Sequence, residues 1–290
     1  MDIFTGTSLI LWLQQSSPYL DWPFRIITAL GNESFFLLFL PLIYWCLDRR
    51  MGAELAVLFL ISASLNAVAK AAFGMPRPFA VDSAVMQLAS AQGNGFPSGH
   101  TQGAMVVWLY LAARSQKTWL WWLAGGLIFL IPVSRLYLGV HFPADLLGGY
   151  VLGGGLVLIF WKAEQRVTAM LEFRSTAFLL TGFGLIAGVS AVWAKGQGDY
   201  VVSAAAALMG TAVGLVMERR WVRFAPRTRL PQRLICYLAG IIGLLVIYIG
   251  LKIGFAGVEP AWLLRFLRYG LVGLWVAAGA PWLFTRMVHR

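Results

Sequence analysis

Charged residues are scarce in this 290-residue chain, and cysteine and histidine are scarcer still. Charged side chains make up 12% of the sequence, against 59% hydrophobic residues and a mean hydropathy of +0.74. This balance lies outside the range of soluble globular proteins, in which about a quarter of the residues are charged. The two cysteines, Cys46 and Cys236, argue against a disulfide framework or a zinc site, and we expect both to be packing residues. The composition therefore indicates an integral membrane protein.

The surplus of basic residues lies mostly in short loops between apolar runs. It gives a net charge of +11, yet basic residues in such loops set membrane topology rather than bind nucleic acid, so we expect no nucleic-acid partner. The densest cluster is "RRWVRFAPRTRLPQR", residues 219–233. Under the positive-inside rule this cluster and its alternate loops lie in the cytosol. We expect a multi-pass protein of the cell (inner) membrane, with its remaining loops facing the periplasm or exterior.

Apolar runs bounded by charge, glycine or proline predict an all-α fold, a polytopic membrane helix bundle. Residues 3–16 are too short to span and lack a charged n-region, so they predict an interfacial helix. The expected spans are 24–47, 52–72, 99–113, 118–135, 143–161, 175–194, 200–217, 234–256 and 262–285. The architecture is then a core of about six helices, of which the first is interfacial, followed by about four additional transmembrane helices.

The polar segment "KAEQRVTAMLEFR" separates two blocks. We expect a catalytic core at 1–161, a cytosolic linker at 162–174 and a further transmembrane region of unknown role at 175–290. Small residues at GxxxG spacing let helices approach closely in lipid. Such spacings occur at 149–153, 184–188, 210–214 and 250–254, and we interpret them as helix-packing sites.

Polar residues cluster in three loops that the topology places on the outer face. They are Lys70, Arg77 and Pro78; "PSGH" at 97–100; and Ser134, Arg135, His141 and Asp145. Singly, each has an ordinary explanation: a lysine can snorkel from a helix end, and Ser98 can cap the helix that begins at Gly99. Taken together, they indicate one common site. Two of the three histidines of the chain, His100 and His141, lie in these outer loops with the arginines.

The residue types in these loops match the needs of a phosphate group. A phosphate carries about −1.5 to −2 charges and three acceptor oxygens at neutral pH, so it favours fixed cations and N–H donors. Lys70, Arg77 and Arg135 supply the cations. The helix start at Ser98 and Gly99 supplies free backbone N–H groups and the positive end of a helix dipole. A phosphate site is therefore expected at this helix start.

The two histidines differ in their neighbours. Asp145 follows His141 by four residues, with Pro143 suited to the first turn of the helix between them. A carboxylate there would fix the imidazole tautomer and leave the other nitrogen free to attack. His100 has no such carboxylate and is better suited to protonate a leaving group.

These three groups, with their spacing, resemble the signature motifs of the membrane-bound type 2 phosphatidic acid phosphatase superfamily. Its members include lipid phosphate phosphatases and, among soluble relatives, vanadium haloperoxidases. The match covers residues 70–145, and the family's helical core would extend over about 1–161. Residues 175–290 have no counterpart in the family's usual six-helix pattern, so the resemblance implies no role for them.

The resemblance implies a division of labour within the site. His141 would form a phosphohistidine, Asp145 would orient it, and His100 would protonate the leaving oxygen. The phosphoryl oxygens would be held by Lys70, Arg77, Ser98, Gly99, Arg135 and Ser134. The resemblance implies neither a metal nor another cofactor, and the sequence offers no carboxylate cluster for Mg²⁺.

The expected function is that of a lipid phosphatase acting on a membrane lipid phosphate. The same cations and N–H donors would bind the phosphate group of several lipids: phosphatidate, phosphatidylglycerol phosphate, isoprenyl diphosphate and sphingoid phosphate. Two alternatives remain open: a phosphoryl transferase using the same site with a lipid or sugar acceptor, and a lipid-translocating or partner-binding protein with a vestigial phosphatase core. The sequence does not indicate an oligomeric state.

Near the outer ends of the last two helices, Lys252, Arg265 and Arg268 are either interfacial anchors or a second headgroup contact.

Overall fold

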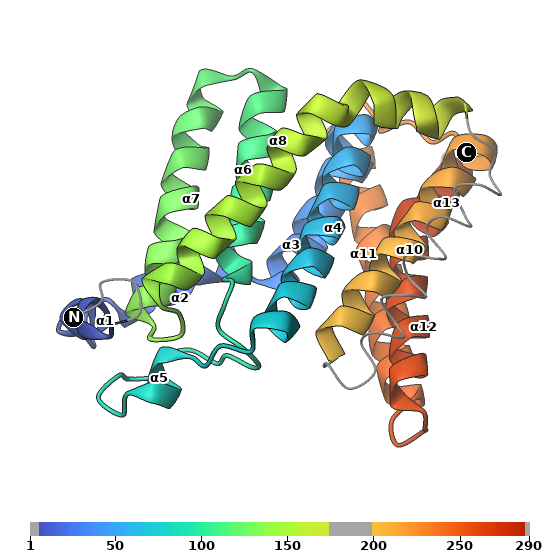
Figure 1. The fold of residues 1–290 in the computed structure, drawn as a ribbon. Helices are drawn as coiled ribbons and strands as arrows, with labels where there is room; N and C mark the ends of the chain where they lie inside the picture. The colour runs from blue at the N-terminus through green and yellow to red at the C-terminus, as the bar shows by residue number, and fades with distance from the viewer. Residues whose placement is uncertain (1–5, 174–198, 288–290) are drawn as a thin grey trace. The chain divides into compact units, whose positions relative to one another are not determined.

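The computed structural model describes residues 6–173 and 199–287, and these are helical over most of their length (Figure 1). Three short π-helical segments, labelled η, interrupt or extend the α-helices. In chain order the elements are α1 (Ser8–Gln14), α2 (Asp21–Ala29), α3 (Glu33–Leu42), η1 (Ile43–Leu47), α4 (Arg49–Phe73), α5 (Pro78–Val81), α6 (Gly99–Ser115), α7 (Thr118–Tyr137), α8 (Pro143–Phe173), α10 (Asp199–Met217), η2 (Glu218–Val222), α11 (Leu230–Gly254), α12 (Ala261–Leu274), η3 (Trp275–Gly279) and α13 (Ala280–Met287). The predicted all-α membrane fold is confirmed.

Six helical stretches in the described residues are long and apolar enough to cross a membrane. They are 49–81, 118–137, 143–163, 201–222, 230–254 and 261–287. Each corresponds to one predicted span. The predicted span at 99–113 is α6, whose 17 residues make it about 26 Å long, shorter than a hydrocarbon core of about 30 Å. The predicted span at 175–194 lies outside the described residues.

The first predicted span, 24–47, is not one continuous helix. The helical segments Asp21–Ala29 and Glu33–Leu47 meet at a bend of 46°, and the pair counts as a seventh span only if the two halves are taken together. Gly31 and Asn32 form the break. A Cβ atom on Gly31 would lie 2.9 Å from the imidazole of His100 and 2.9 Å from Ile131, so the break is where this segment meets α6 and α7.

The ends of two other predicted segments also differ from expectation. The interfacial helix expected at 3–16 is α1, Ser8–Gln14, in the described residues. The linker expected at 162–174 is helical as far as Phe173, because α8 continues without a break. Residues such as Lys162, Ala163 and Glu164 are good helix formers despite their polarity, so a helix can leave the apolar run and continue.

Cα packing divides the chain into two compact units. One comprises Met1–Phe36 and Leu65–Lys162, and the other comprises Leu37–Ser64 and Ala163–Arg290. Residues 37–64 thus pack with the C-terminal helices, although we expected them in the first block. The division into a catalytic core at 1–161 and a further region at 175–290 stays a prediction about function.

In the first unit, α6 and α8 approach each other at glycines of α8. A Cβ atom on Gly149 would lie 2.8 Å from the backbone oxygen of Ser98, and one on Gly153 would lie 2.9 Å from that of Gln102. The amide of Ser98 also donates to the backbone oxygen of Asp145 at 2.9 Å. The GxxxG spacing at 149–153 therefore serves helix packing, as predicted, and it joins the start of α6 to the start of α8.

A small apolar cluster fixes the loop that follows α7. Tyr137, Leu138 and Val140 are fully buried. Gln14 of α1 donates to the backbone oxygens of Met86 at 2.7 Å and Tyr137 at 2.9 Å, and it accepts from the amide of Met86 at 3.0 Å. Gly139 turns the loop with a φ of +73°, and a Cβ atom there would lie 2.3 Å from the oxygen of Met86. Helix α1 thus holds the segment that leads to His141.

The second unit has its own core and an ion pair. Its buried cluster contains Trp45, Phe284 and both cysteines, which are free and buried, as predicted for packing residues. Arg49 pairs with the buried Glu218 at 2.9 Å.

The two GxxxG spacings of the second unit that lie in described residues behave differently. A Cβ atom on Gly210 would clash with the backbone of Gly270, so the spacing at 210–214 packs α10 against α12, as predicted. Gly250 and Gly254 have no atom of the described structure within 4 Å of such a Cβ atom, and the packing role predicted for 250–254 is not seen there.

Candidate active site

The predicted site residues come from helix ends and loops of the first unit. Lys70 lies in the last turn of α4, Arg77 just before α5, Ser98 just before α6 and Arg135 in the last turn of α7. His141 lies in the loop before α8, and Asp145 lies in the first turn of α8. Within this unit these helix ends share one side, next to the loop that carries α5 (Figure 1).

His141 is paired with Asp145 as the sequence predicts. Nδ1 of His141 lies 3.0 Å from Oδ2 of Asp145, and both side chains are 3% exposed. The same carboxylate oxygen accepts from the amide of Phe142 at 2.9 Å. A carboxylate held in this way favours the tautomer with the proton on Nδ1, which leaves a lone pair on Nε2. Burial lowers the pKa of His141 well below its ordinary value, and three nearby cations lower it further, so the imidazole is neutral at pH 7.

Arg77 lies against the free nitrogen of His141. Its Nη1 is 3.3 Å from Nε2 of His141 and donates to the backbone oxygen of Val140 at 2.8 Å. Nε donates to the oxygen of Gly93 at 2.9 Å and Nη2 to that of Gln92 at 2.8 Å. The guanidinium therefore ties the loop before α6 to the loop before α8, and its charge lies next to the nitrogen that would attack.

Lys70 is fixed by the same loop. Its Nζ donates to the backbone oxygens of Asn94 at 2.7 Å and Gly95 at 3.0 Å, while the side chain of Asn94 donates to the oxygen of Lys70 at 2.8 Å. An ammonium group has three N–H donors, so two carbonyl contacts leave one for a ligand. The two carbonyl contacts thereby hold the ammonium group of Lys70 in one position beside the loop before α6.

The start of α6 offers backbone donors. Ser98 is its N-cap, and its hydroxyl accepts from the amide of Thr101 at 3.4 Å. Gly99 is the first helical residue. The first amides of a helix have no partners within the helix and face outward along its axis, where the helix dipole is positive. An anion at this end would meet the amides of Gly99 and His100.

His100 and Arg135 each contact a polar residue of α2 or of the break after it. Nε2 of His100 lies 2.8 Å from Oδ1 of Asn32, and Nη1 of Arg135 donates to the hydroxyl of Thr28 at 2.7 Å. The buried Nε of Arg135 has no hydrogen-bond partner within the described residues. Such an orphaned donor suits an acceptor that arrives with a ligand.

Ser134 is buried in its own helix. Its hydroxyl donates to the backbone oxygen of Ile131 at 2.5 Å. It would have to break this bond to donate to a phosphoryl oxygen, so its contact with the substrate stays a prediction.

Three supporting residues were missed in the sequence: Thr28, Asn32 and Asn66. The side-chain amide of Asn66 donates to the backbone oxygen of Pro97 at 3.3 Å and to Oε1 of Gln102 at 2.8 Å, and so holds the "PSGH" segment. A signal was present for Thr28 and Asn66, because each is a polar residue in a mainly apolar run, whereas Asn32 stands in the polar break that continues with Glu33 and Ser34. Asn66 also lies four residues before Lys70, on the same face of α4.

The arrangement can do nucleophilic chemistry on an anion. It joins a neutral imidazole oriented by a carboxylate, three cations, a helix start and a second imidazole. Within the described ranges, no group of three or more His, Cys, Asp or Glu side chains is placed to hold a metal ion.

Comparison with protein families gives two matches along the chain. Residues 52–169 match the model of the PAP2 superfamily, and residues 202–289 match the model described as "PAP2 superfamily phosphatase, transmembrane extension". The second match corrects the expectation that the C-terminal helices have no counterpart in the family. The signal was not visible as a motif, because apolar helices that share a fold need share few particular residues.

Individual relatives carry phosphatase names. Sphingosine-1-phosphate phosphatase 1 of Mus musculus is 24% identical over 66% of this chain and 46% of its own length, so this chain matches somewhat less than half of that relative. Phosphatidylglycerophosphatase B of Bacillus subtilis is 32% identical over 54% of this chain and 80% of its own length.

This chain is also similar to the crystal structure of a transmembrane PAP2-type phosphatidylglycerolphosphate phosphatase from Bacillus subtilis. The superposition covers 55% of this chain and 86% of the crystallised chain, at 25% identity and a TM-score of 0.45. The motif residues, the two family matches and the similarity to the Bacillus phosphatase B over most of that protein's length agree, and the chain belongs to the PAP2 superfamily.

Proposed function

We propose that this protein is a membrane lipid phosphatase that hydrolyses a phosphate monoester or diphosphate lipid through a phosphohistidine intermediate. The observation that carries the proposal is the position of His141. Its Nδ1 is held by Asp145 at 3.0 Å, and its Nε2 lies 3.3 Å from Arg77, where a bound phosphate would be drawn by the cation. A neutral imidazole with a fixed tautomer is an activated nucleophile.

In the first step, the lone pair on Nε2 of His141 attacks phosphorus. The bond between phosphorus and the lipid oxygen breaks, and the departing alkoxide takes a proton from His100. Lys70, Arg77 and Arg135, with the amides at the start of α6, stabilise the charge on the three equatorial oxygens. Asp145 stabilises the positive charge that develops on the imidazole ring.

In the second step, a water molecule attacks the phosphohistidine. His100, now neutral, accepts a proton from that water as the P–N bond breaks. Inorganic phosphate leaves, and both histidines return to their starting states. Neither step needs a metal ion. The side chains of Lys70, Arg77 and Arg135 face the phosphoryl charges that a metal ion would otherwise neutralise.

The depth of the site suits a lipid. Helix α6 is about 26 Å long, against about 30 Å of hydrocarbon, so its catalytic end lies below the outer surface and a headgroup can reach it sideways from the bilayer. The relatives' names include sphingosine-1-phosphate, phosphatidylglycerophosphate and undecaprenyl diphosphate substrates. We propose that the substrate belongs to this group of lipid phosphates, and that the site faces the periplasm or exterior.

Phosphate release from a panel of these lipids tests the proposal. The purified protein in detergent should hydrolyse at least one lipid phosphate, keep its activity in excess EDTA and be inhibited by vanadate, which mimics five-coordinate phosphorus. The His141→Ala variant should be inactive on every lipid of the panel. Activity that is lost on chelation and restored by Mg²⁺ would contradict the proposal, as would hydrolysis by the His141→Ala variant.

A further inference from the structure

The second unit holds an arginine well inside its last helical hairpin. Arg268 lies seven residues after Ala261, the first residue of α12, or about 10 Å along the helix. Its Cζ is 5.3 Å from the centre of the Tyr248 ring and 5.2 Å from that of Tyr269, and the two rings pack edge to face at 5.9 Å. Tyr248 belongs to α11 and lies about 9 Å before its end at Gly254.

This guanidinium carries a charge that the described part of the protein does not neutralise. Among the side chains that the structure describes, which do not include those of residues 164–200, no acidic group forms an ion pair with Arg268, and its buried Nε has no hydrogen-bond partner. Glu259, the acidic residue in the preceding loop, accepts from the amide of Ala261 at 2.7 Å. A charged residue within a membrane helix is costly and normally has a partner, and the described side chains supply no acidic one for Arg268.

Snorkelling explains Lys252 better than it explains Arg268. Lys252 is exposed and lies two residues from the end of α11, where an ammonium reaches the interface easily. The guanidinium of Arg268 instead lies over two tyrosine rings about two turns inside the helix ends. Cation–π contacts retain the guanidinium at that depth, but they leave its net charge in place.

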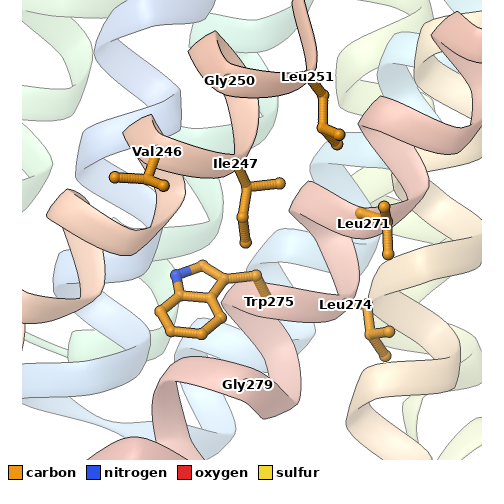
Figure 2. Close-up of a pocket in the computed structure, with 8 residues that line it drawn as sticks. All are labelled: Val246, Ile247, Gly250, Leu251, Leu271, Leu274, Trp275 and Gly279. Atoms are coloured by element: carbon orange, nitrogen blue, oxygen red, sulfur yellow. The ribbon is translucent and has the colours of Figure 1, made fainter. Parts of the chain in front are cut away.

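An apolar hollow is lined by residues close in sequence to both partners of this contact: Ile247 and Leu251 flank Tyr248 on α11, and Leu271 follows Arg268 by three residues on α12. It has a volume of about 390 Å³ and is lined by α11 on one side and by α12 and η3 on the other. Figure 2 shows Ile247 and Leu251 of α11 facing Leu271, Leu274 and Trp275 across it, with Gly250 leaving space at its upper end. The indole N–H of Trp275 already donates to the backbone oxygen of Gly240 at 2.9 Å, so the hollow offers an incoming group only apolar surface there.

A cation close to an apolar hollow matches the two parts of a phospholipid. We propose that α11, α12 and η3 form a binding site for an anionic phospholipid, whose headgroup phosphate pairs with Arg268 and one of whose acyl chains lies in the hollow between Ile247 and Trp275. Lys252, one turn from Tyr248 along α11, adds a second positive charge on the headgroup side. This site is separate from the phosphatase chemistry, because it is built from the C-terminal helices alone.

Photo-crosslinking tests the site without relying on activity. The full-length protein is placed in nanodiscs of dioleoylphosphatidylcholine that contain a trace of phosphatidylglycerol with a diazirine in one acyl chain, and the labelled peptides are mapped by mass spectrometry. We expect labelling within 246–251 and 271–279, reduced about tenfold in Arg268→Gln, because a lost charge-assisted contact is worth about one decade in affinity or more. Lipid bound at the phosphatase site would label other peptides.

Matched variants and probes decide the outcome. Arg220→Gln removes an exposed arginine of η2 and should label as the wild type does. Arg268→Lys keeps the charge but loses the planar fork, so it should label at an intermediate level and covers the case in which Arg268→Gln folds poorly. Equal labelling by a diazirine phosphatidylcholine, or unchanged labelling in both Arg268 variants, would overturn the proposal. Suppression of labelling by inorganic phosphate at the concentration of the lipid would overturn the assignment to a lipid, because a bound acyl chain should outcompete the free anion.

Discussion

Nδ1 of His141 lies 3.0 Å from Oδ2 of Asp145, while Nε2 of the same ring lies 3.3 Å from Nη1 of Arg77. One nitrogen therefore faces an anion and the other faces a cation. The carboxylate keeps the proton on Nδ1, and the cation disfavours a second proton on Nε2. The pair thus keeps the ring neutral and oriented, which is what a nucleophile that must act at neutral pH requires.

The first prediction concerns pH. Burial and nearby cations lower the pKa of His141, so kcat/KM should fall on the acid side only below the ordinary histidine value of about 6.5. Removing a cation favours the protonated ring and raises its pKa, so Lys70→Met should move the acid limb to higher pH. The substrate's own ionisation is the same in both enzymes and drops out of the comparison. Lys162→Met, at an exposed site, is the control and should leave the profile unchanged. If Lys70→Met did not move the acid limb of kcat/KM, the charge of Lys70 would not control the pKa of His141.

A second prediction separates the two histidines by the leaving group. A lipid alkoxide must be protonated as it departs, whereas p-nitrophenolate can leave unaided. General acid catalysis typically contributes about 10² to 10⁴-fold. The His100→Ala variant should lose about that much activity on a lipid phosphate and much less on p-nitrophenyl phosphate. Equal losses on the two substrates would remove His100 from the role of general acid.

The third prediction tests the contact that joins α6 to α8. A methyl group on Gly149 would lie 2.8 Å from the backbone oxygen of Ser98, so Gly149→Ala must push the start of α6 away from Asp145. We expect a loss of about 1 to 3 kcal/mol in stability, measured by thermal unfolding in detergent, with a fall in kcat. Gly155→Ala on the same helix is the matched control, since nothing lies within 4 Å of its added Cβ atom. It should be neutral or stabilising by up to about 1 kcal/mol. Equal stability and equal kcat in the two variants would mean that the close approach of α8 to α6 at Gly149 is not needed for stability or activity.

Membrane orientation gives the fourth prediction. Ser90 and Thr228 are exposed, and the native Cys46 and Cys236 are buried, so single cysteines at these positions can be labelled over a low background. If the basic loops are cytosolic, Ser90→Cys should react with an impermeant maleimide in intact cells and Thr228→Cys should react only after lysis. The opposite pattern would place the active site in the cytosol.

The sequence predicted most helices because long apolar runs fix both their existence and their approximate ends. It missed the bend at Gly31 and Asn32, although the residues Gly-Asn-Glu interrupt the apolar run there. The break depends on a contact with His100 and Ile131, which are far away in the sequence. The short π-helical segments likewise leave no periodic signal.

The motif residues of the candidate site were predictable because their chemistry is unusual in a membrane helix. The residues that support them were not predictable, because the partners of Thr28, Asn32 and Asn66 become visible only in the fold. The same limit applies to Arg77 and Lys70: the sequence indicated phosphate-binding cations, but it could not show that backbone oxygens of residues 92–95 hold both.

The most direct test of the account is the trapping of a covalent phosphoenzyme on His141. The protein is mixed with radiolabelled p-nitrophenyl phosphate, quenched in alkali, in which phosphohistidine survives, and digested for peptide mapping. We predict an acid-labile label on the peptide that contains His141, retained in His100→Ala and absent in His141→Ala. A label that persists without His141, or that maps to another residue, would contradict the central claim.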